Sequence, residues 1–449
     1  MKIVNHENLN GLQNKKIIAG FTLGCKVNQY ETEAIMELFK NRGYEIGFFE
    51  DYADIYLINT CTVTNVGDKK SRQMIRRAHK KNPNATIIVV GCYAQVAPKE
   101  VAMIEGVDMV LGTHQRNQIV DLYEEYTKLQ EPIIQVDNIM KVREFEEMSI
   151  STLQEKTRAY LKIQEGCDRF CSYCIIPYTR GPVRSRSPEN IIKEIKTLVA
   201  NGYKEIVLTG IHVGSYGKDI KNIDLNELLK NIHSIQELER IRFSSIEPTF
   251  VTDAFIQTIQ RLPKVCRHFH LSLQSGSNRT LKRMNRKYTK EMYQEKAEIL
   301  RKAFIDVALT TDVIVGFPGE TREDFEESYK FVEQIQFSKI HVFPYSPKKG
   351  TPAAQYPDQL SNKIKEERSK QMIQLGEKLE SQFLKKHLNT IQKVLFETRV
   401  SEGNQYEGHT SNYMKVQAYS SRSLENETQL VRIIDHRKDH LIGEILDNQ

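Results

Sequence analysis

The stretch GCDRFCSYC, residues 166–174, decides how the central part of this chain is interpreted. It contains Cys167, Cys171 and Cys174 in the spacing C-x3-C-x2-C. Three thiolates suit a [4Fe–4S] cluster in which one iron keeps an open position, whereas zinc sites and complete ferredoxin sites normally use four protein ligands. An open iron can take the amino and carboxylate groups of S-adenosylmethionine, so the spacing favours a radical cofactor site. The alternative is a structural zinc site whose fourth ligand lies elsewhere, such as His212 or Cys266.

Three further cysteines predict a second cluster. Cys25, Cys61 and Cys92 each end a short β-branched run and precede a helical pattern, which is the alternation of a parallel α/β sheet. Because the carboxyl ends of neighbouring parallel strands meet at one edge, the three thiols are expected to converge there. The alternative is three buried structural cysteines. Cys266 lacks such a setting and is expected to be an ordinary core residue.

The composition is that of a water-soluble intracellular protein. The chain has 449 residues, a net charge of +6 and seven cysteines, an odd number grouped as metal ligands. This pattern predicts two or three domains in a reducing cytoplasm rather than a disulfide scaffold. Residues 1–16 lack the apolar core of a signal peptide, and no run of 18 apolar residues occurs, so we expect no membrane association.

The hydrophobic pattern predicts an α/β protein in three parts. The first is a doubly wound parallel α/β domain over 15–127, with a fourth strand near 109–112. After a mixed linker over 128–157, six strand-like runs alternate with helical patterns and predict a partial (β/α)6 barrel over 158–387, including a trailing charged helix. The last part, 388–449, has short β runs separated by Gly, Asn and Ser and predicts a small β-barrel.

Two runs of positive charge are candidates for a nucleic-acid surface. KKSRQMIRRAHKK (69–81) holds seven Lys or Arg and no acid, and NRTLKRMNRKYTK (278–290) holds six and no acid. Lys69, Lys70, Arg76 and Arg77 in the first run are the predicted phosphate contacts. The alternative is that these charges are solvated helix faces. The C-terminal part is slightly acidic, so charge alone does not make it an RNA-binding module.

The order of motifs resembles that of the radical S-adenosylmethionine methylthiotransferases over residues 15 to 446. The segments are TLGCKVNQYE, NTCTVTNVGDKK, GCYAQ, GCDRFCSYCIIPYTRG, LTGIHVGSYG, SSIEP, LQSGSNRTLKRMNRKYT and TDVIVGFPGET. Together with EGHTSNYMKV near the C-terminus, they look most like the MtaB type, which acts on N6-threonylcarbamoyladenosine in tRNA. Other branches act on isopentenyladenosine in tRNA or on a ribosomal-protein aspartate. An alternative of another class is a non-enzymatic RNA-binding metalloprotein.

The resemblance implies a fold and a set of cofactors. It implies closure of the central part as a radical S-adenosylmethionine barrel and a C-terminal TRAM-like RNA-binding domain. Cys167, Cys171 and Cys174 would hold the [4Fe–4S] cluster that cleaves S-adenosylmethionine, and the other triad would hold an auxiliary [4Fe–4S] cluster. One S-adenosylmethionine would methylate a sulfur there, and a second would give the radical that attacks C2 of the adenine. The implied partners are tRNA at its anticodon stem-loop, an external electron donor and a sulfur donor.

Further residues are candidates for cofactor and substrate contacts. The cofactor candidates follow strands of the central barrel or lie in the cysteine loop, and they are Tyr173, Gly210, Ile211, His212, Val213, Gly214, Glu247, Gln274, Arg286 and Asp312. Arg286 is the candidate for the methionine carboxylate, because a guanidinium binds carboxylates bidentately; its alternative is an RNA-facing cation. Arg180, Arg184 and Arg186, just past the cysteine loop, are candidates for a carboxylate on the substrate.

Overall fold

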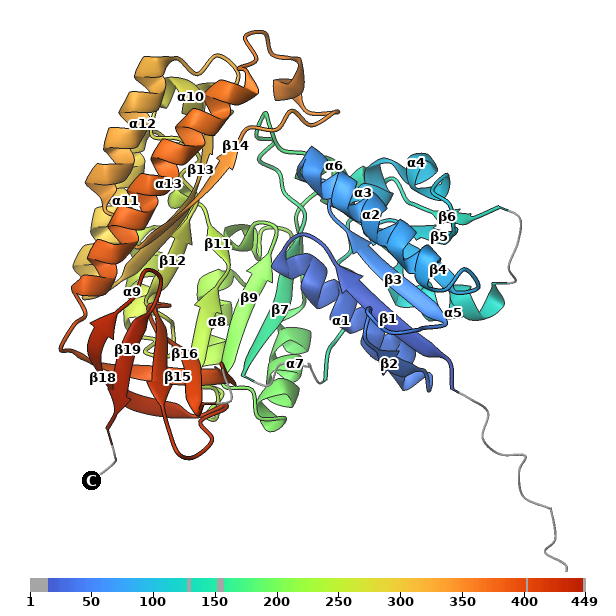
Figure 1. The fold of residues 1–449 in the computed structure, drawn as a ribbon, viewed down its shortest axis with the longest axis horizontal. Helices are drawn as coiled ribbons and strands as arrows, with labels where there is room; N and C mark the ends of the chain where they lie inside the picture. The colour runs from blue at the N-terminus through green and yellow to red at the C-terminus, as the bar shows by residue number, and fades with distance from the viewer. Residues whose placement is uncertain (1–14, 127–130, 152–156, 401–402, 447–449) are drawn as a thin grey trace, which may run out of the picture. The chain divides into compact units, whose positions relative to one another are not determined.

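The computed structural model describes residues 15–126, 131–151, 157–400 and 403–446, which fall into two compact units. The first unit comprises residues up to 62, 66–138 and 146–149, and the second comprises 63–65, 139–145 and 150 onwards. Figure 1 shows the ribbon coloured along the chain. Within the described residues, no helix has the length and apolar character needed to cross a membrane.

The first unit is built on a six-stranded parallel sheet with the strand order β2-β1-β3-β4-β5-β6. The strands are β1 (Ile17–Thr22), β2 (Glu45–Gly47), β3 (Ile55–Thr60), β4 (Thr86–Gly91), β5 (Val107–Leu111) and β6 (Ile133–Gln135). The helices are α1 (Lys26–Asn41), α2 (Asn65–Lys81), α3 (Cys92–Val96), α4 (Pro98–Ala102) and α5 (Ile119–Glu125). The strand order reverses at β1, as in a doubly wound sheet, which confirms the predicted fold class.

One strand lies where the sequence predicted a linker. β6 falls within 128–157 and pairs with β5 from Met109↔Ile133 to Leu111↔Gln135. The sheet of the first unit therefore continues beyond residue 127. Three residues are too few for a periodic pattern to reveal an edge strand.

The second unit carries a partial barrel of parallel strands. Its strands are β7 (Arg158–Glu165), β9 (Glu205–Gly210), β10 (Arg240–Phe243), β11 (Ser245–Ile246), β12 (His268–Leu271), β13 (Ala308–Val315) and β14 (Lys339–Pro344). β10 and β11 are one chain segment interrupted at Ser244, so the sheets β10-β9-β7-β8 and β11-β12-β13-β14 continue each other. The two-residue β8 (Arg184–Ser185) pairs antiparallel with β7 and was not predicted.

Helices connect the barrel strands, and most begin at a capping residue. The helices are α6 (Ile176–Arg180), α7 (Pro188–Ala200), α8 (Leu225–His233), α9 (Asp253–Gln260), α10 (Asn278–Arg283), α11 (Lys290–Ala303), α12 (Arg322–Ile335) and α13 (Asn362–Lys385). Ser187, Asp224 and Thr252 accept a backbone N–H at the start of α7, α8 and α9. Such caps satisfy amides that the first turn leaves unpaired. The six βα repeats that the sequence predicted are present.

The C-terminal strands form a closed barrel in the order β15-β16-β17-β19-β18. They are β15 (Ile391–Arg399), β16 (Gln405–Thr410), β17 (Lys415–Tyr419), β18 (Thr428–His436) and β19 (Leu441–Ile445). The predicted small barrel is confirmed, but β16 was missed, because QYEGHT holds a single apolar residue, Tyr406. Tyr406 and Gly408 nevertheless face the interior.

Part of the EGHTSNYMKV motif attaches this barrel to the central strands of the same unit. Tyr413 lies between the rings of His268 and His409, with ring centroids 4.9 and 4.7 Å away. The guanidinium of Arg242 lies 4.5 Å from the Tyr413 ring, and Arg158 donates to its hydroxyl at 2.9 Å. These stacking and cation–π contacts assign the Tyr413 turn to domain docking.

Candidate functional site

Cys25, Cys61 and Cys92 lie at one edge of the sheet in the first unit. Each follows one of three adjacent strands, β1, β3 and β4. The register pairs Thr60 with Gly91, which places the residues after β3 and β4 side by side. This edge includes the point where the strand order reverses, which is where doubly wound sheets bind ligands.

The turn that carries Cys25 approaches β3 closely. Gly24 has φ +107, and a Cβ there would lie 3.0 Å from Cβ of Cys61 and 3.2 Å from its Sγ. Only glycine meets both demands without strain. Asn28 fixes the same turn by donating to the carbonyl oxygens of Leu23 and Thr60 at 2.7 and 3.1 Å. The Cys25 turn therefore packs closely against Cys61, and the convergence of all three thiols stays a prediction.

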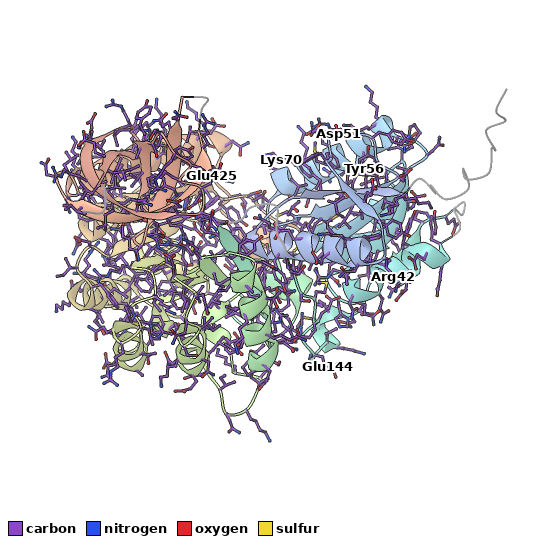
Figure 2. The ribbon with its side chains drawn as sticks, turned by 90° about the horizontal axis from the view of Figure 1, so that it is seen from below. Arg42, Asp51, Tyr56, Lys70, Glu144 and Glu425 are labelled. Atoms are coloured by element: carbon purple, nitrogen blue, oxygen red, sulfur yellow. The ribbon has the colours of Figure 1, made fainter. Side chains whose placement is uncertain are left out.

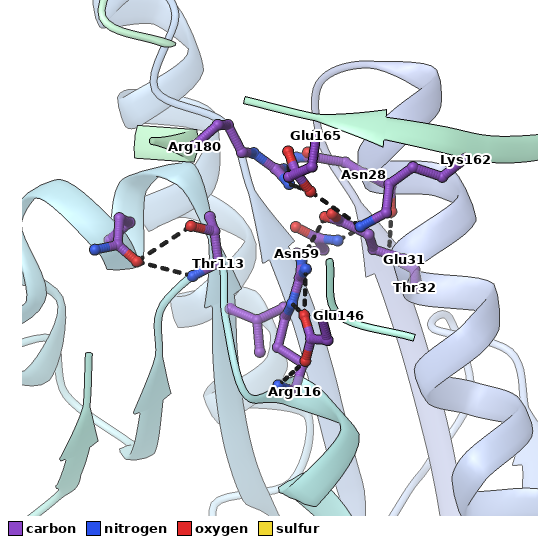
Figure 3. Close-up of polar contacts among 12 residues, drawn as sticks. Asn28, Glu31, Thr32, Asn59, Thr113, Arg116, Glu146, Lys162, Glu165 and Arg180 are labelled. Carbon is purple, nitrogen blue, oxygen red and sulfur yellow. Dashed lines mark hydrogen bonds and ion pairs between the residues drawn. The ribbon is translucent and has the colours of Figure 1, made fainter. Parts of the chain in front are cut away.

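A buried cluster of ion pairs stabilises the first unit. Arg116 pairs with Glu31 on α1 and with Glu146, each at 2.7 Å, and all three side chains are at most 5 % exposed. Glu146 also accepts the backbone N–H of Asn117 at 3.0 Å. Figure 3 shows this arrangement beside Asn59. Sequence reasoning missed the cluster, because a lone Arg in a loop carries no signal of burial.

The second cysteine triad lies in the loop after β7, in the second unit. Gly166 begins the loop with φ +74, and a Cβ there would lie 1.8 Å from the carbonyl oxygen of Pro182. The loop is tied by hydrogen bonds from Cys167 N to Gly181 O (3.0 Å) and from Cys174 N to Cys171 O (2.9 Å). The loop therefore has one tightly held conformation at the carboxyl end of the first barrel strand.

The environment of these thiols suits a ligand that displaces protons. Burial and the neighbouring Cys171 together raise the pKa of Cys174 to about 12, although a backbone hydrogen bond from Ile176 opposes the shift. Burial likewise raises the pKa of Cys167 to about 11, against a backbone hydrogen bond from Arg169. Three thiols in one short loop, two of them accepting backbone hydrogen bonds, fit a metal cluster that binds thiolates.

Glu247 is the centre of a charged group beside this loop. Its carboxylate oxygens lie 2.8 Å from Arg169 Nε, 3.1 Å from Arg286 Nη2 and 3.3 Å from His212 Nε2. Burial alone would raise the pKa of Glu247, but the hydrogen bond from His212 and the charges of Arg286 and Arg169 lower it to about 2. The carboxylate is therefore ionised at neutral pH. Thr249 completes the group by donating to Glu247 at 3.2 Å.

His212 and Cys266, the alternative fourth ligands for a zinc ion, have other neighbours in the structure. His212 is engaged by Glu247 and by Ser215, whose hydroxyl lies 2.6 Å from Nδ1. Burial raises the pKa of the Cys266 thiol, next to the opposing charge of Arg242. Among the described residues, no three or more His, Cys, Asp or Glu side chains are grouped as for a single metal ion.

Most of the remaining cofactor candidates lie at the carboxyl ends of barrel strands, whereas Asp312 lies within β13. Gly210, Ile211, His212, Val213 and Gly214 end β9 and begin a 3₁₀ turn (Val213–Ser215). The backbone N–H of His212 donates to Oε1 of Gln164 at 2.7 Å. Gln274, with φ +69, donates its N–H to the carbonyl oxygen of Asp312 at 2.9 Å, and Asp312 Oδ2 lies 3.3 Å from His270 Nε2. Their contacts with a cofactor stay predictions.

Tyr173 is part of an aromatic cluster. Its ring meets Phe317 edge-on at 6.4 Å, and Phe317 in turn contacts Tyr345 and Tyr356 at 5.3 and 6.3 Å. Met284 also packs in this cluster. Tyr173 therefore packs against this aromatic cluster, and an adenine contact stays a prediction.

The three arginines predicted to meet a substrate carboxylate are buried, and their contact with a substrate stays a prediction. Arg180, Arg184 and Arg186 are each at most 2 % exposed. Arg186 Nη1 pairs with Glu194 on α7 at 2.5 Å, and Arg180 Nη1 lies 3.2 Å from Glu165 Oε2. Figure 3 shows Arg180 beside Glu165. A carboxylate within the chain already occupies these two guanidinium groups.

We expect Arg186→Ala to destabilise the protein rather than to change substrate choice. The substitution leaves Glu194 buried without its cation, which costs about 3–5 kcal/mol. Thermal unfolding followed by circular dichroism should show a clear drop in the midpoint. The double variant Arg186→Met/Glu194→Leu should recover most of it, since an apolar pair of similar volume replaces a buried ion pair at little cost. An unchanged midpoint for Arg186→Ala, together with lost modification activity, would restore the substrate role.

The run 278–290 is largely committed to internal contacts, contrary to the expectation of a phosphate-tracking surface. Arg279 pairs with Asp324 at 2.6 Å, Lys290 pairs with Glu327, and Arg283 donates to the carbonyl oxygen of Pro318 at 3.0 Å. Arg286 is buried beside Glu247. Lys282 and Lys287 remain exposed.

The run 69–81 lies on α2 and is more open. Lys69, Lys70 and Arg76 are exposed, and the described residues provide no ion pair for them. Arg77 instead pairs with Glu50. Three of the four predicted phosphate contacts are thus uncompensated cations; Figure 2 labels Lys70 on this helix.

Comparisons with known proteins agree with this architecture. Residues 161–332 match the Radical SAM superfamily, and residues 18–112 match the family described as Uncharacterized protein family UPF0004. Two structures of the radical S-adenosylmethionine methyltransferase TsrM from Kitasatospora setae share the fold, with TM-scores of 0.56 and 0.52 and 14 % identity. The alignments cover 76 % and 73 % of this chain and 77 % and 73 % of those chains. The barrel and its cysteine loop thus place residues 161–332 in the radical SAM superfamily.

Relatives narrow the assignment. The chain is 49 % identical to the threonylcarbamoyladenosine tRNA methylthiotransferase MtaB of Bacillus subtilis, over 89 % of both chains. It is 41 % identical to the Aquifex aeolicus MtaB over 82 % of this chain and 90 % of that protein. It is 35 % identical to a tRNA-2-methylthio-N(6)-dimethylallyladenosine synthase of Clostridium botulinum, over 94 % and 95 %. The chain therefore belongs to the radical SAM methylthiotransferase family, and the resemblance of its motifs is confirmed.

Proposed function

We propose that this protein adds a methylthio group to C2 of N6-threonylcarbamoyladenosine in tRNA. The observation that carries the proposal is the pair of cysteine triads at the carboxyl edges of two parallel sheets, on a chain similar over 89 % of its length to an enzyme named for this reaction. The isopentenyl-type relatives, named as dimethylallyladenosine synthases, are less similar, at 35 % identity.

The two triads would each hold one [4Fe–4S] cluster. Cys167, Cys171 and Cys174 would bind the cluster at which S-adenosylmethionine is reductively cleaved, which supplies the radical chemistry an unactivated C–H carbon requires. Cys25 and its two partners in the first unit would bind the auxiliary cluster. In both triads three thiol donors leave one iron for another ligand.

The chain's own residues would fix the geometry at the radical site. Gly166 and the backbone hydrogen bonds of the loop hold its main chain in a tight turn that would present the three thiols. Glu247 keeps Arg169, Arg286 and His212 in place at the rim of the barrel. Glu247, Arg286 and Cys171 are largely buried, which strengthens the electrostatic contacts among them.

Further partners follow from the chemistry. Reductive cleavage needs a low-potential one-electron donor, and repeated methylthio transfer needs a sulfur source. We propose that both are separate molecules in the cytoplasm, where thiols stay reduced.

For tRNA, we propose that the exposed cations of α2 contact phosphates. Replacing Lys69, Lys70 and Arg76 with Gln should weaken tRNA binding and lower the slope of log affinity against log salt by about one per lost contact. Arg77→Gln is the matched control on the same helix, because Glu50 already compensates that charge. Filter binding over a salt series measures both quantities. Equal slopes for the triple variant and the unsubstituted protein would mean that the three cations are merely solvated.

The substrate assignment is tested with reconstituted protein under anaerobic conditions. Two tRNA preparations, one with threonylcarbamoyladenosine and one with isopentenyladenosine, are each incubated with S-adenosylmethionine and a reductant. Mass spectrometry of the nucleosides should detect the 2-methylthio product from the first tRNA only. Efficient modification of the second would overturn the substrate assignment while leaving the family intact.

A further inference from the structure

Arg286 contacts a cysteine of the radical loop directly. Its Nη1 lies 3.2 Å from Sγ of Cys171, its Nη2 lies 3.1 Å from Glu247 and its Nε donates to the Tyr288 hydroxyl at 2.9 Å. Its side chain is 8 % exposed. All three guanidinium nitrogens thus have a partner within the protein, and the partner of Nη1 is a predicted cluster ligand.

The surroundings of Arg286 hold it in this orientation. The Tyr288 ring lies 4.8 Å from the guanidinium carbon. The Tyr288 hydroxyl donates to the carbonyl oxygens of Ser272 and Leu273, the two residues after β12, at 2.7 Å each. Glu247 is itself fixed by other partners. Because a planar guanidinium presents its donors as a rigid fork, two fixed contacts determine the direction of the third.

We propose that Arg286 is a positioning residue that donates a hydrogen bond to the sulfur of Cys171 and thereby makes the cluster easier to reduce. The inference rests on the proposed binding of a [4Fe–4S] cluster by the three cysteines. It differs from the expectation that Arg286 binds the methionine carboxylate, because in this structure the guanidinium is directed at a cysteine sulfur and at Glu247.

The sign of the effect follows from charge. One-electron reduction by an external low-potential donor adds a negative charge to the cluster and its thiolates. A nearby cation and a hydrogen bond to sulfur stabilise that charge, and both are known determinants of cluster potential. Glu247 is an anion close to the same site and acts in the opposite direction. The interior position of both groups limits solvent screening.

Redox titration of the full-length protein tests the proposal. The protein carries Cys25→Ala, Cys61→Ala and Cys92→Ala, so that the signal comes from one cluster, and no S-adenosylmethionine is added. At the solution potential that half-reduces this parent, set with dithionite, paramagnetic resonance measures the ratio of reduced to oxidised cluster. Arg286→Gln should lower that ratio about tenfold, equivalent to about 59 mV for a one-electron couple.

Two further variants fix the interpretation. Glu247→Gln should raise the ratio, since it removes the opposing charge, and a general folding defect would not move the two variants in opposite directions. Lys287→Gln is the matched control, because it removes an exposed positive charge one residue away. The Lys287 amino group donates a hydrogen bond to Oδ1 of Asn285 at 2.8 Å. The ratio for Lys287→Gln should equal that of the parent.

Different results would contradict the role of Arg286 and the proposed function of the protein. Unchanged ratios for Arg286→Gln and Glu247→Gln, at full iron content, would overturn the inference; if only S-adenosylmethionine affinity then fell, Arg286 would be a carboxylate ligand. If the Arg286→Gln protein loses its iron, the test uses Tyr288→Phe instead. We expect a smaller drop in the ratio of reduced to oxidised cluster for this variant, and an unchanged ratio would contradict the proposal. A parent protein that binds no cluster would instead refute the proposed function.

Discussion

Replacing Cys167, Cys171 and Cys174 together with alanine is expected to abolish cleavage of S-adenosylmethionine while leaving about half of the protein's iron. Two four-iron clusters give about eight irons in anaerobically reconstituted protein, and the variant should retain about four. The first unit has its own core and its own cysteine triad, so loss of the loop cluster should not empty it. Removing the cluster that accepts the electron leaves no route to the radical.

Iron and sulfide analysis and the formation of 5′-deoxyadenosine measure this prediction. Cys266→Ala is the control, because that thiol is buried beside Arg242 and belongs to neither triad. It should keep full iron and full cleavage. If the triple variant kept about eight irons, the loop would not be a cluster site.

The second large effect is expected at the other triad. Replacing Cys25, Cys61 and Cys92 with alanine should preserve cleavage to 5′-deoxyadenosine but end methylthio transfer to tRNA. The physical reason is that the two triads would act separately: the loop of the second unit would generate the radical, and the edge of the first unit would hold the sulfur that is transferred. Each replacement removes a single sulfur atom, so the sheet should keep its packing.

The readouts for this variant are 5′-deoxyadenosine and 2-methylthio nucleoside in the same reaction. Circular dichroism should match the parent. Loss of both products in a correctly folded variant would contradict two separable sites. Continued methylthio transfer would mean that the auxiliary site lies elsewhere.

Much of the fold could be predicted because its signals are local. β3 and β5 are buried at every residue, and the cysteines that follow β1, β3 and β4 mark the carboxyl edge of one sheet. The six βα repeats of the second unit likewise follow from runs of apolar residues with helical patterns between them. The strands that were missed, β2, β6, β8 and β16, are very short or polar, so they carry no comparable period.

The partners of charged residues could not be predicted, because they depend on contacts far apart in the sequence. Arg186 meets Glu194 and Arg116 meets Glu31 only after the chain has folded. Arg286 belongs to a basic run that suggested RNA contact or a cofactor carboxylate, yet it lies buried between Glu247 and Cys171. Sequence identified Glu247 and Arg286 as important; only the structure shows that they contact each other.

The measurement that tests the account most directly is nucleoside mass spectrometry of tRNA from cells with and without the gene. The account predicts that 2-methylthio-N6-threonylcarbamoyladenosine is present with the gene, disappears without it and is replaced by unmodified N6-threonylcarbamoyladenosine. Restoring the gene should restore the product, whereas a copy lacking Cys25, Cys61 and Cys92 should not. Unchanged levels of the methylthio nucleoside in the deletion strain would contradict the account.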